Sequence, residues 1–314
     1  MGITWIADGI GYVPGRVNVG VVQLEGDRAL IIDTGLNQDH ALAVLRDVES
    51  AGLRPYALLV THGHADHFGG APTLRRDGLE LIAASSYEAA FLRLPCLVLL
   101  SLVGGAVPPP ELVRTFHVPS ASKVDLEVVP GPFHLPLAAV AGNMRLVDLA
   151  GHSPGQLGLQ VGDVAFVGDA VSSPEIWAKS RLVYFSEVAP AIDSIRRLEE
   201  LQCAVIVAGH TAEAENPARL LDANRENLLA LSAQIEALVR AGLYPRGQVS
   251  AHQVTLSTED ITSSLASAFG LELTTLHRFF VTRAVVRAHL SYLAGKGRVT
   301  PLASGGRLFW APTH

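Results

Sequence analysis

The sequence predicts an α+β protein in which two β-sheets pack face to face with helices on the outside, followed by a small C-terminal winged-helix-like domain. Two observations predict this architecture. Short apolar strands separated by turns occur in two groups along the first part of the chain, and each group includes an amphipathic helical segment. Near the C-terminus, two helical segments precede two short strands, which is the element order of a winged-helix module.

Composition narrows the class of protein. The chain has 314 residues, of which 49% are hydrophobic and 17% charged, so a disordered protein is excluded and one large or two unequal domains fit. Its two cysteines, Cys96 and Cys203, cannot form a disulfide framework or a four-cysteine zinc site. No basic region followed by a long apolar stretch stands at the start, so we expect a cytoplasmic protein.

The two groups of strands follow one pattern. The first begins with two strands that turn at Gly26-Asp27, and helical spacing of apolar residues marks one helix in each group. The first group consists of the strands Val17–Leu24, Ala29–Asp33, Ala57–Thr61 and Leu79–Ala84 and the helix His40–Ser50. The second consists of the strands Met144–Leu149, Leu157–Val161, Val164–Val167 and Ala204–Ala208 and the helix Ala191–Leu201.

A long helix, Pro217–Arg240, separates these groups from the C-terminal segment. We therefore expect three parts: a first domain at residues 1–215, a linking helix at 216–245, and the winged-helix-like domain at 246–314. The last part is predicted to contain the helices Thr258–Phe269 and Thr274–Ala294 and the strands Arg298–Leu302 and Arg307–Ala311.

One segment, Leu94–Val107, is almost entirely apolar. It is shorter than the ~18–20 residues that a membrane span needs, and Pro95 and the glycine pair would interrupt it, so we expect no membrane span. An exposed apolar patch of this length is unfavourable in a monomer. We expect either a buried helical lid or a contact between two copies of the chain in a homodimer.

The strongest chemical signal follows the strand Ala57–Thr61. Within six residues the chain carries His62, His64, Asp66 and His67, with the small residues Gly63 and Ala65 between them. Small spacers allow neighbouring side chains to leave a tight loop in different directions. Imidazole nitrogen and carboxylate oxygen are ordinary zinc ligands, so the pattern predicts a metal site.

Three later residues complete a ligand set. His152, Asp169 and His210 each lie beside a glycine, just after a predicted strand. Taken singly, such a residue is more often an ordinary turn residue. Because strand ends on one edge of a sandwich can converge, we expect these three to join the cluster.

With these motifs, residues 1–215 resemble the metallo-β-lactamase fold superfamily, which implies an αβ/βα metallo-β-lactamase sandwich. The resemblance implies one metal site at His62, His64 and His152, a second at Asp66, His67 and His210, and Asp169 as the bridging carboxylate. It implies that Asp33, in Asp33-Thr34-Gly35, supports the metal loop without ligating. It further implies two divalent metal ions as cofactors, with Zn²⁺ favoured over Fe or Mn.

The bridging position distinguishes relatives within the superfamily. Zinc β-lactamases of the commonest class carry Cys where Asp169 stands, whereas Asp is typical of glyoxalase II-like thioesterases, lactonases and nucleases. We therefore expect a binuclear hydrolase that uses a metal-bridging hydroxide on a small-molecule thioester, ester or lactone. Asp66 and Asp169 are the predicted catalytic residues. The apolar segment would favour an acyl substrate. Trp177, Tyr184 and Phe185 are candidate pocket walls, and packing in the core is the alternative for each.

The residues after about 245 resemble the winged-helix-like extension of the β-lactamase-like protein 2 branch. The match rests on Asp260-Ile261, on a helix with apolar residues at Val285, Val286, Leu290 and Leu293, and on Gly297-Arg298-Val299. Seven basic and three acidic residues follow Ala241, so this part has a net charge of +4 within a chain of −6.

Two alternatives to the acyl hydrolase stay open. One is a metal-dependent phosphodiesterase or ribonuclease whose C-terminal module contacts nucleic acid. Its phosphate contacts would come from Arg278, Arg283, Arg287, Arg298 and Arg307. The other is a non-catalytic or redox protein on the same scaffold, which would need lost ligands or iron.

Overall fold

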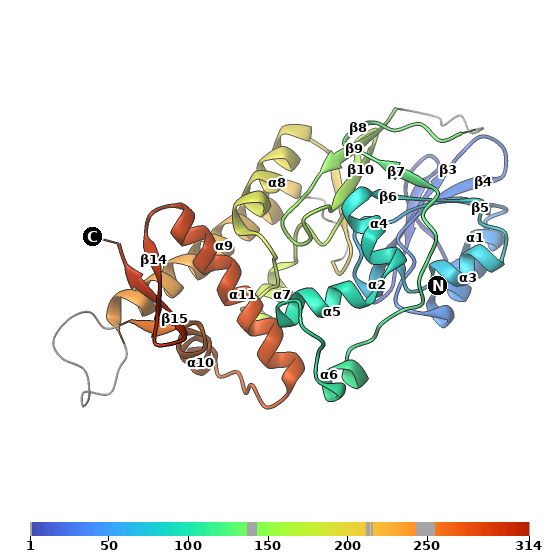
Figure 1. The fold of residues 1–314 in the computed structure, drawn as a ribbon. Helices are drawn as coiled ribbons and strands as arrows, with labels where there is room; N and C mark the ends of the chain where they lie inside the picture. The colour runs from blue at the N-terminus through green and yellow to red at the C-terminus, as the bar shows by residue number, and fades with distance from the viewer. Residues whose placement is uncertain (1, 137–142, 212–213, 215, 243–254, 314) are drawn as a thin grey trace.

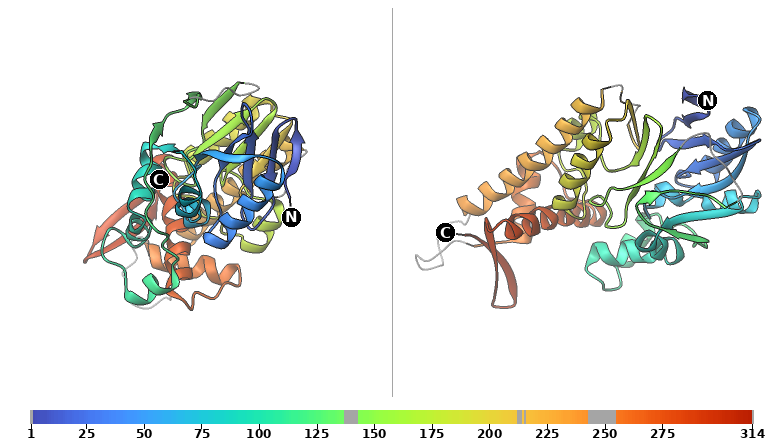
Figure 2. Two further views of the ribbon diagram at one scale, coloured as in Figure 1. Left: turned by 90° about the vertical axis from the view of Figure 1, so that its right-hand side faces the viewer. Right: turned by 90° about the horizontal axis from the view of Figure 1, so that it is seen from above.

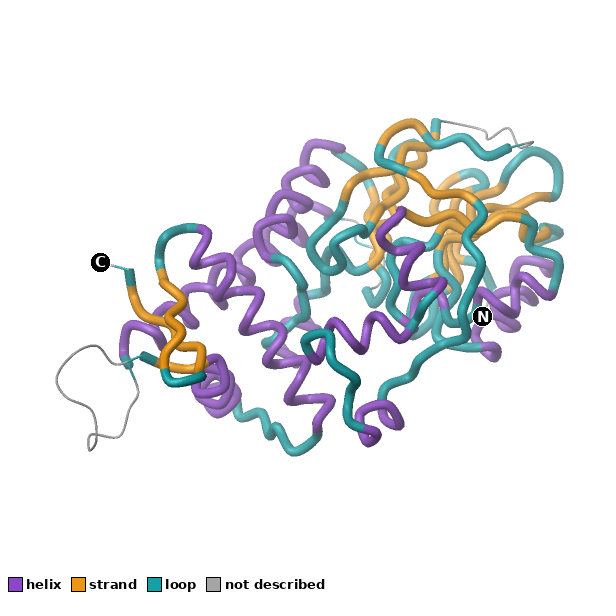
Figure 3. Tube along the Cα trace, in the orientation of Figure 1, coloured by secondary structure: helices purple, strands orange, loops and turns teal. Residues whose placement is uncertain are grey.

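The computed structural model describes residues 2–136, 143–211, 214, 216–242 and 255–313 (Figure 1). Within them the chain forms two sheets that carry helices on their outer faces, and a C-terminal module with a third, small sheet. The predicted α+β sandwich is confirmed. Figure 3 shows the strands of the two large sheets gathered at the upper right with helices beside them, and the strands of the C-terminal module apart from them at the left.

The first sheet has seven strands in sequence order, β1 to β7. Its first four strands are antiparallel, and β4 to β7 run parallel. The predicted hairpin corresponds to β3 and β4. The strands are β1 (Thr4–Ala7), β2 (Ile10–Val13), β3 (Val19–Gln23), β4 (Arg28–Ile32), β5 (Arg54–Leu59), β6 (Leu81–Ser85) and β7 (Leu126–Val128).

The second sheet has the order β12-β11-β10-β9-β8, in which only the β11–β12 pair is parallel. The sequence analysis missed the edge strands β1, β7 and β8 and the strand β2 beside β1, which are two to four residues long. The strands are β8 (Gly131–Pro132), β9 (Met144–Asp148), β10 (Leu157–Val161), β11 (Val164–Gly168) and β12 (Val205–Ala208).

Apolar side chains from both sheets form the central core, where Leu30 and Leu59 of the first sheet share one buried cluster with Leu146, Leu159 and Phe166 of the second. The outer face of each sheet buries its own amphipathic helices. Asn37 caps the first of them by accepting a hydrogen bond from the His40 backbone N–H. The covering helices are α1 (Gln38–Ser50) and α3 (Ala71–Arg76) on the first sheet, and α7 (Pro174–Ser180) and α8 (Val188–Leu201) on the second.

The layers place several strand ends at one edge of the sandwich. β4 ends just before Asp33, β5 before the histidine loop, β11 before Asp169, and β12 before Gly209-His210. β4 pairs in parallel with β5, as β11 does with β12. Their carboxyl ends therefore lie side by side, and the polar residues that follow them gather there.

The long helix α9 (Pro217–Ala241) contributes to two cores. Leu220, Leu221 and Leu228 pack with the helices of the second sheet, whereas Leu231 and Ile235 pack within the C-terminal module. Figure 2 shows α9 and the module extending from one side of the sandwich. The domain boundaries at 215 and 245 stay a prediction, since both positions lie outside the described residues.

The C-terminal module has the predicted order of helix, helix and hairpin. Its elements are β13 (Leu256–Ser257), α10 (Thr258–Ala268), α11 (Leu276–Gly295), β14 (Val299–Ser304) and β15 (Arg307–Pro312), with sheet order β13-β15-β14. Ser257 and Asp260 form a capping box at the start of α10. Assignment of the module as a winged helix stays a prediction.

The apolar segment expected at Leu94–Val107 is helical only over α5 (Cys96–Val103), which follows α4 (Ser86–Arg93) and ends at Gly104 with φ 96°. Leu99 is buried, but Leu94 and Val107 are 57% and 89% exposed, so the segment is not one buried lid. α5 and the following α6 (Pro110–Thr115) contact α11 of the C-terminal module. A homodimer contact stays a prediction.

Among the described helices, no single one is long and apolar enough to cross a bilayer. Only α4 and α5 together have that length and composition, and they are bent by 105° relative to each other.

A buried histidine joins α9 to α11. Ser232 Oγ donates to the Leu228 carbonyl and lies 2.8 Å from His289 Nδ1, while His289 Nε2 has no hydrogen-bond partner among the described residues. Burial lowers the pKa of His289 to about 4. The unfolded chain therefore takes up a proton at a higher pH than the folded one, so this residue reduces stability as the pH falls from about 6.5 toward 4.

Replacing His289 with Leu should weaken the acid sensitivity of the fold. Between pH 7.5 and about pH 5, the free energy of unfolding should fall by roughly 2 kcal/mol less in His289→Leu than in the unchanged protein. Urea unfolding at both pH values measures this difference, and exposed His134→Leu is the matched control. Equal losses in the His289 variant and the unchanged protein would contradict the assignment.

Candidate metal centre

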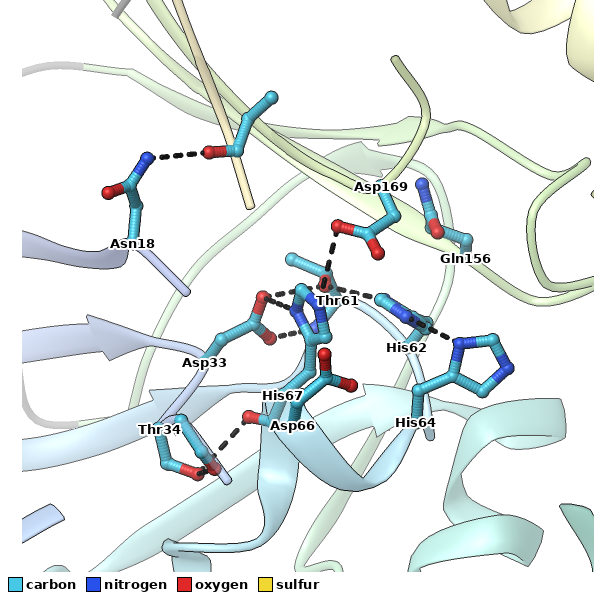
Figure 4. Close-up of polar contacts among 12 residues, drawn as sticks. Asn18, Asp33, Thr34, Thr61, His62, His64, Asp66, His67, Gln156 and Asp169 are labelled. Atoms are coloured by element: carbon cyan, nitrogen blue, oxygen red, sulfur yellow. Dashed lines mark hydrogen bonds and ion pairs between the residues drawn. The ribbon is translucent and has the colours of Figure 1, made fainter. Parts of the chain in front are cut away.

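The structure brings all seven predicted ligands together at the edge of the sandwich. Residues from the loop after β5 and from α2 (Ala65–Phe68) meet residues that follow β9, β11 and β12. Three groups have ligand atoms within 4.8 Å of one another: His62, His64 and His152; His62, His67 and Asp169; and Asp66, His67 and His210. Figure 4 shows the members that come from the first half of the chain together with Asp169.

Three imidazoles form the first group. His64 Nδ1 lies 3.1 Å from His62 Nε2 and 2.9 Å from His152 Nε2. The outer nitrogens of the other two are engaged elsewhere: His152 Nδ1 donates to the Tyr184 carbonyl, and His62 Nδ1 to Thr61 Oγ1, whose own hydrogen goes to Asp33. Both Nε2 lone pairs therefore point at one place.

These three imidazoles are neutral at ordinary pH. Burial lowers the pKa of His62 well below its usual value and that of His64 to about 3, and burial also lowers the pKa of His152. Neutral imidazole is the form that coordinates a metal ion.

The second group combines one carboxylate with two imidazoles. His210 Nε2 lies 3.2 Å from Asp66 Oδ2, and its Nδ1 donates to the Arg16 carbonyl at 2.7 Å. Hydrogen bonds to Asp169 and Asp66 raise the pKa of His210 to about 10. Burial alone would lower the pKa of His67, but the charges of Asp169 and Asp33 raise it well above its usual value. These positions attract a proton or a metal cation, which compete for the same lone pairs.

Asp169 lies between the two groups. Its Oδ1 is 3.3 Å from His67 Nε2, and its Oδ2 is 3.6 Å from His152 Nε2 and 3.4 Å from His210 Nε2. Burial would raise the pKa of Asp169, but the positive charge of His67 and a hydrogen bond with His210 hold it well below its usual range. One ionised carboxylate thus faces ligands of both groups.

Two observations show that these residues fit metal ions. Among the described residues, His67 Nε2 and Asp169 Oδ1 are buried without a hydrogen-bond partner, although each is a ligand atom. The backbone beside them leaves room: a Cβ on Gly209 would lie 2.4 Å from Asp169 Oδ1 and 2.7 Å from His67 Cε1. The donor set of imidazole nitrogens and carboxylate oxygens suits Zn²⁺.

Asp33 supports the cluster from behind. Its carboxylate accepts hydrogen bonds from the Thr61 backbone N–H and hydroxyl, each at 2.8 Å, and from His67 Nδ1 at 2.7 Å (Figure 4). Asp33 has φ 63°, a left-handed conformation that is unfavourable for a residue with a Cβ. The strained backbone thus aims one carboxylate at two metal-loop residues, as the sequence analysis expected.

Asn18 ties the loop that carries His210 to the first half of the sandwich. Its side-chain amide donates to the Ala208 and Thr211 carbonyls at 2.9 and 2.6 Å, and its backbone N–H donates to the Gly209 carbonyl. Figure 4 shows this side chain reaching across to the other sheet. The sequence analysis did not identify Asn18.

Glu88 is the most informative residue that the sequence analysis missed. It is completely buried, and its two oxygens accept from the Gly63 N–H at 2.7 Å, Ser153 Oγ at 2.6 Å and the Gly155 N–H at 3.0 Å. Gly63 stands between two ligands, and Ser153 follows a third. Burial raises the pKa of Glu88, while these hydrogen bonds favour its ionised form. Glu88 therefore joins the two ligand loops of the first group.

The local sequence around Glu88 indicates a different role, that of a helix-capping residue. Ser85 and Glu88 have the spacing of a capping box, and the Ser85 side chain does accept from the Glu88 N–H. The Glu88 carboxylate, however, turns away from the helix start toward the ligand loops.

The three aromatic residues named as pocket walls separate into two roles. The Tyr184 ring lies 5.5 Å from that of His152 and 5.8 Å from that of His64, and burial raises the pKa of Tyr184 to about 12. Trp177 and Phe185 are buried in the core under the second sheet, and the Trp177 indole donates to Asn224. Of the three, Tyr184 is the one that lines the cavity in front of the cluster.

Replacing Glu88 with Gln should weaken metal binding without unfolding the protein. The amide keeps the shape of the side chain but replaces one acceptor oxygen with a donor, which then faces an N–H or a hydroxyl. Loss of such a supporting contact costs about 10–100-fold in metal affinity. Competition with a chromophoric chelator measures the affinity, and exposed Glu49→Gln serves as the control. Unchanged metal affinity in Glu88→Gln would contradict the role of Glu88 in holding the two ligand loops together.

Comparison with known proteins agrees with this geometry. The sequence profile of the Metallo-beta-lactamase superfamily matches residues 12–142 and 144–210. The chain is 24% identical over 218 residues to a hydroxyacylglutathione hydrolase from Nitrosomonas eutropha, which covers 68% of this chain and 70% of that protein. A hydroxyacylglutathione hydrolase from Enterobacter sp. (strain 638) is 41% identical over 56 residues, so the match spans 18% of this chain and about a fifth of that relative's length.

Solved structures share the fold over nearly the whole chain. A beta-lactamase domain protein from Burkholderia ambifaria superimposes with a TM-score of 0.75 at 18% identity, covering 99% of this chain and 94% of that one. A metallo-beta-lactamase family protein from Thermus thermophilus gives 0.69 at 18% identity, covering 98% and 100%. With the profile match over more than half of its residues, the chain belongs to the metallo-beta-lactamase superfamily.

Proposed function

We propose that this protein is a binuclear metal-dependent hydrolase that cleaves the thioester, ester or lactone bond of a small molecule. The position of Asp169 carries the proposal, because one buried carboxylate faces His152 of the first group and His67 and His210 of the second. The relatives named as hydroxyacylglutathione hydrolases support an acyl substrate.

His62, His64 and His152 would hold one cation, and Asp66, His67 and His210 the other, with Asp169 shared between them. Zn²⁺ fits these donors best, and Fe or Mn ions accept the same ligand types. When bound, two such cations supply a nucleophile from water at neutral pH and polarise a carbonyl oxygen.

The chain's own groups position the reactants. The Asp66 carboxylate borders the open cavity and can accept a hydrogen bond from the attacking water, which orients its lone pair toward a carbonyl carbon. The Tyr184 hydroxyl keeps its proton at neutral pH, since its pKa is about 12. It can therefore donate a hydrogen bond to the oxygen on which negative charge develops.

Nothing among the described residues favours the nuclease alternative. Two of the arginines expected to contact phosphates already have carboxylate partners: Arg283 pairs with Glu259 at 2.8 Å, and Arg298 with Glu236 at 2.9 Å. A third, Arg287, lines a cavity next to the metal cluster. Binding of nucleic acid therefore stays a prediction.

Asp169→Ala should lower metal content and activity together. The purified protein should contain about two zinc-like ions per chain and hydrolyse a thioester, whereas the variant should lose at least one ion and lose kcat/KM by at least about 100-fold. Elemental analysis and a substrate panel that includes single-stranded RNA measure both quantities.

Exposed Asp163→Ala, on the turn between β10 and β11, is the matched control and should keep both metal and activity. Normal turnover by Asp169→Ala would exclude the mechanism, and one iron per chain would favour an oxygenase. Cleavage of RNA with no cleavage of any acyl substrate would favour the nuclease alternative.

A further inference from the structure

A cavity of about 750 Å³ opens directly in front of the metal cluster. Five predicted ligands face it, namely His64, Asp66, His152, Asp169 and His210. A molecule that fills this cavity therefore places one of its groups at the position where the metals would bind. This volume lies within the range of pockets that enclose small organic ligands.

Most of the exposed surface of the cavity wall is apolar, and its apolar side chains come from three separate parts of the chain. Val17 and Leu36 belong to loops of the first half of the sandwich. Val98 and Leu102 lie on α5, Phe116 follows α6, and Val281 lies on α11 of the C-terminal module. Apart from the ligands and Tyr184, the polar side chains on the lining are those of Arg16, Asn37, Asp39, His40, Thr115, His117 and His277.

Packing of α5 and α6 against α11 of the C-terminal module fixes the shape of this cavity. Val98 and Leu102 are four residues apart and share one face of α5, while Leu99 points into the interior and is 2% exposed. Leu112 anchors α6 in the same way, and the Phe116 ring contacts that of His277 at 5.6 Å between centroids. α11 contacts both α5 and α6 (Figure 1). Since His277 and Val281 of α11 line the cavity, the C-terminal module closes one side of it, and we call this larger cavity the chamber.

A second, smaller cavity of about 270 Å³ adjoins the first and shares with it His64, Val98, Leu102, His152 and Tyr184. Glu88, Ser153, Arg287 and Ser291 also contribute to its lining, so polar groups make up a larger share of its surface than in the first cavity. An ester or thioester has two parts on either side of its carbonyl carbon. The two cavities therefore favour an apolar part in the larger one and a polar part in the smaller one.

We propose that the substrate carries a straight aliphatic acyl chain, which lies in the larger chamber between α5, Phe116 and α11 with its carbonyl group at the metal ligands. This inference rests on the proposed function, since it names the acyl group of the bond that the metal centre hydrolyses. Covering apolar walls with methylene groups removes both from water, and each fully buried methylene strengthens binding about fourfold.

The test is a chain-length series on the metal-loaded protein. The probes are straight-chain acyl thioesters of N-acetylcysteamine with two, four, eight and twelve carbons. We expect kcat/KM to rise at least about tenfold from four to eight carbons. In parallel, calorimetry should show that decanoate binds at least about tenfold more tightly than butyrate, which reports on the chamber without any turnover.

Two variants test whether the acyl chain of the substrate lies in the larger chamber. Val281→Trp, on the wall contributed by α11, should lower the ratio of kcat/KM between the eight-carbon and two-carbon thioesters by at least about tenfold, and should weaken decanoate binding. Val113→Trp is the control, because Val113 is 46% exposed on α6 and does not line the chamber. It should leave the ratio and the binding unchanged.

The outcomes separate the two proposals. Turnover that is equal or lower with longer chains, or a Val281→Trp variant with an unchanged ratio, would overturn the aliphatic assignment while leaving the acyl hydrolase standing. If no thioester is turned over but decanoate binds tightly and Val281→Trp weakens that binding, the hydrolase proposal is rejected. The chamber would then still be a site for an aliphatic chain. Neither turnover nor a preference for decanoate would reject both.

Discussion

The site depends on imidazole rings that are held from their outer side. His152 and His210 each donate Nδ1–H to a backbone carbonyl, and His67 donates to Asp33, so that each Nε2 lone pair faces inward. In free solution each ring would exchange tautomers and rotate. The fold removes that freedom before any ion arrives, so a cation meets ligands already aligned, and less binding free energy is lost to ordering them. Every later step of the proposed chemistry requires this alignment.

The same constraint explains why a carboxylate such as Glu88 is kept in the interior. Burial of an ionised carboxylate costs several kcal/mol unless hydrogen bonds compensate it. Glu88 recovers this cost by accepting from Gly63, Ser153 and Gly155, which lie in two loops of opposite halves of the sandwich. Asn18 makes a comparable connection to the loop of His210. The ligand geometry is thus shared between halves, and neither half could set it alone.

Prediction from sequence succeeded where local pattern and chemistry agree, and failed where the determinant is a distant contact. Three of the strands that precede ligands, β5, β11 and β12, contain continuous apolar runs, and the spacing from His62 to His67 is specific, so both could be identified without coordinates. Glu88 could not, because its partners are 25 to 67 residues away and its local context is that of a helix start. For Trp177 and Phe185 the sequence left pocket and core open for a related reason: an aromatic residue downstream of a ligand can face either, and only the packing of α7 and α9 decides which.

Packing of the C-terminal module against α5 and α6 gives it a place in the wall of the cavity. Its helix α11 buries Val285, Val286 and Leu290 in the module's own core, yet its preceding turns contact α5 and α6 and present Val281 to the cavity. Because α11 makes apolar contacts on two sides, it connects the core of the C-terminal module to α5 and α6. The positive charge of the module suggested a surface for anions, but two of its arginines are neutralised by Glu236 and Glu259. In our proposal the module therefore acts on substrate choice through an apolar wall, and α9, which spans both cores, holds that wall at a fixed distance from the metal ligands.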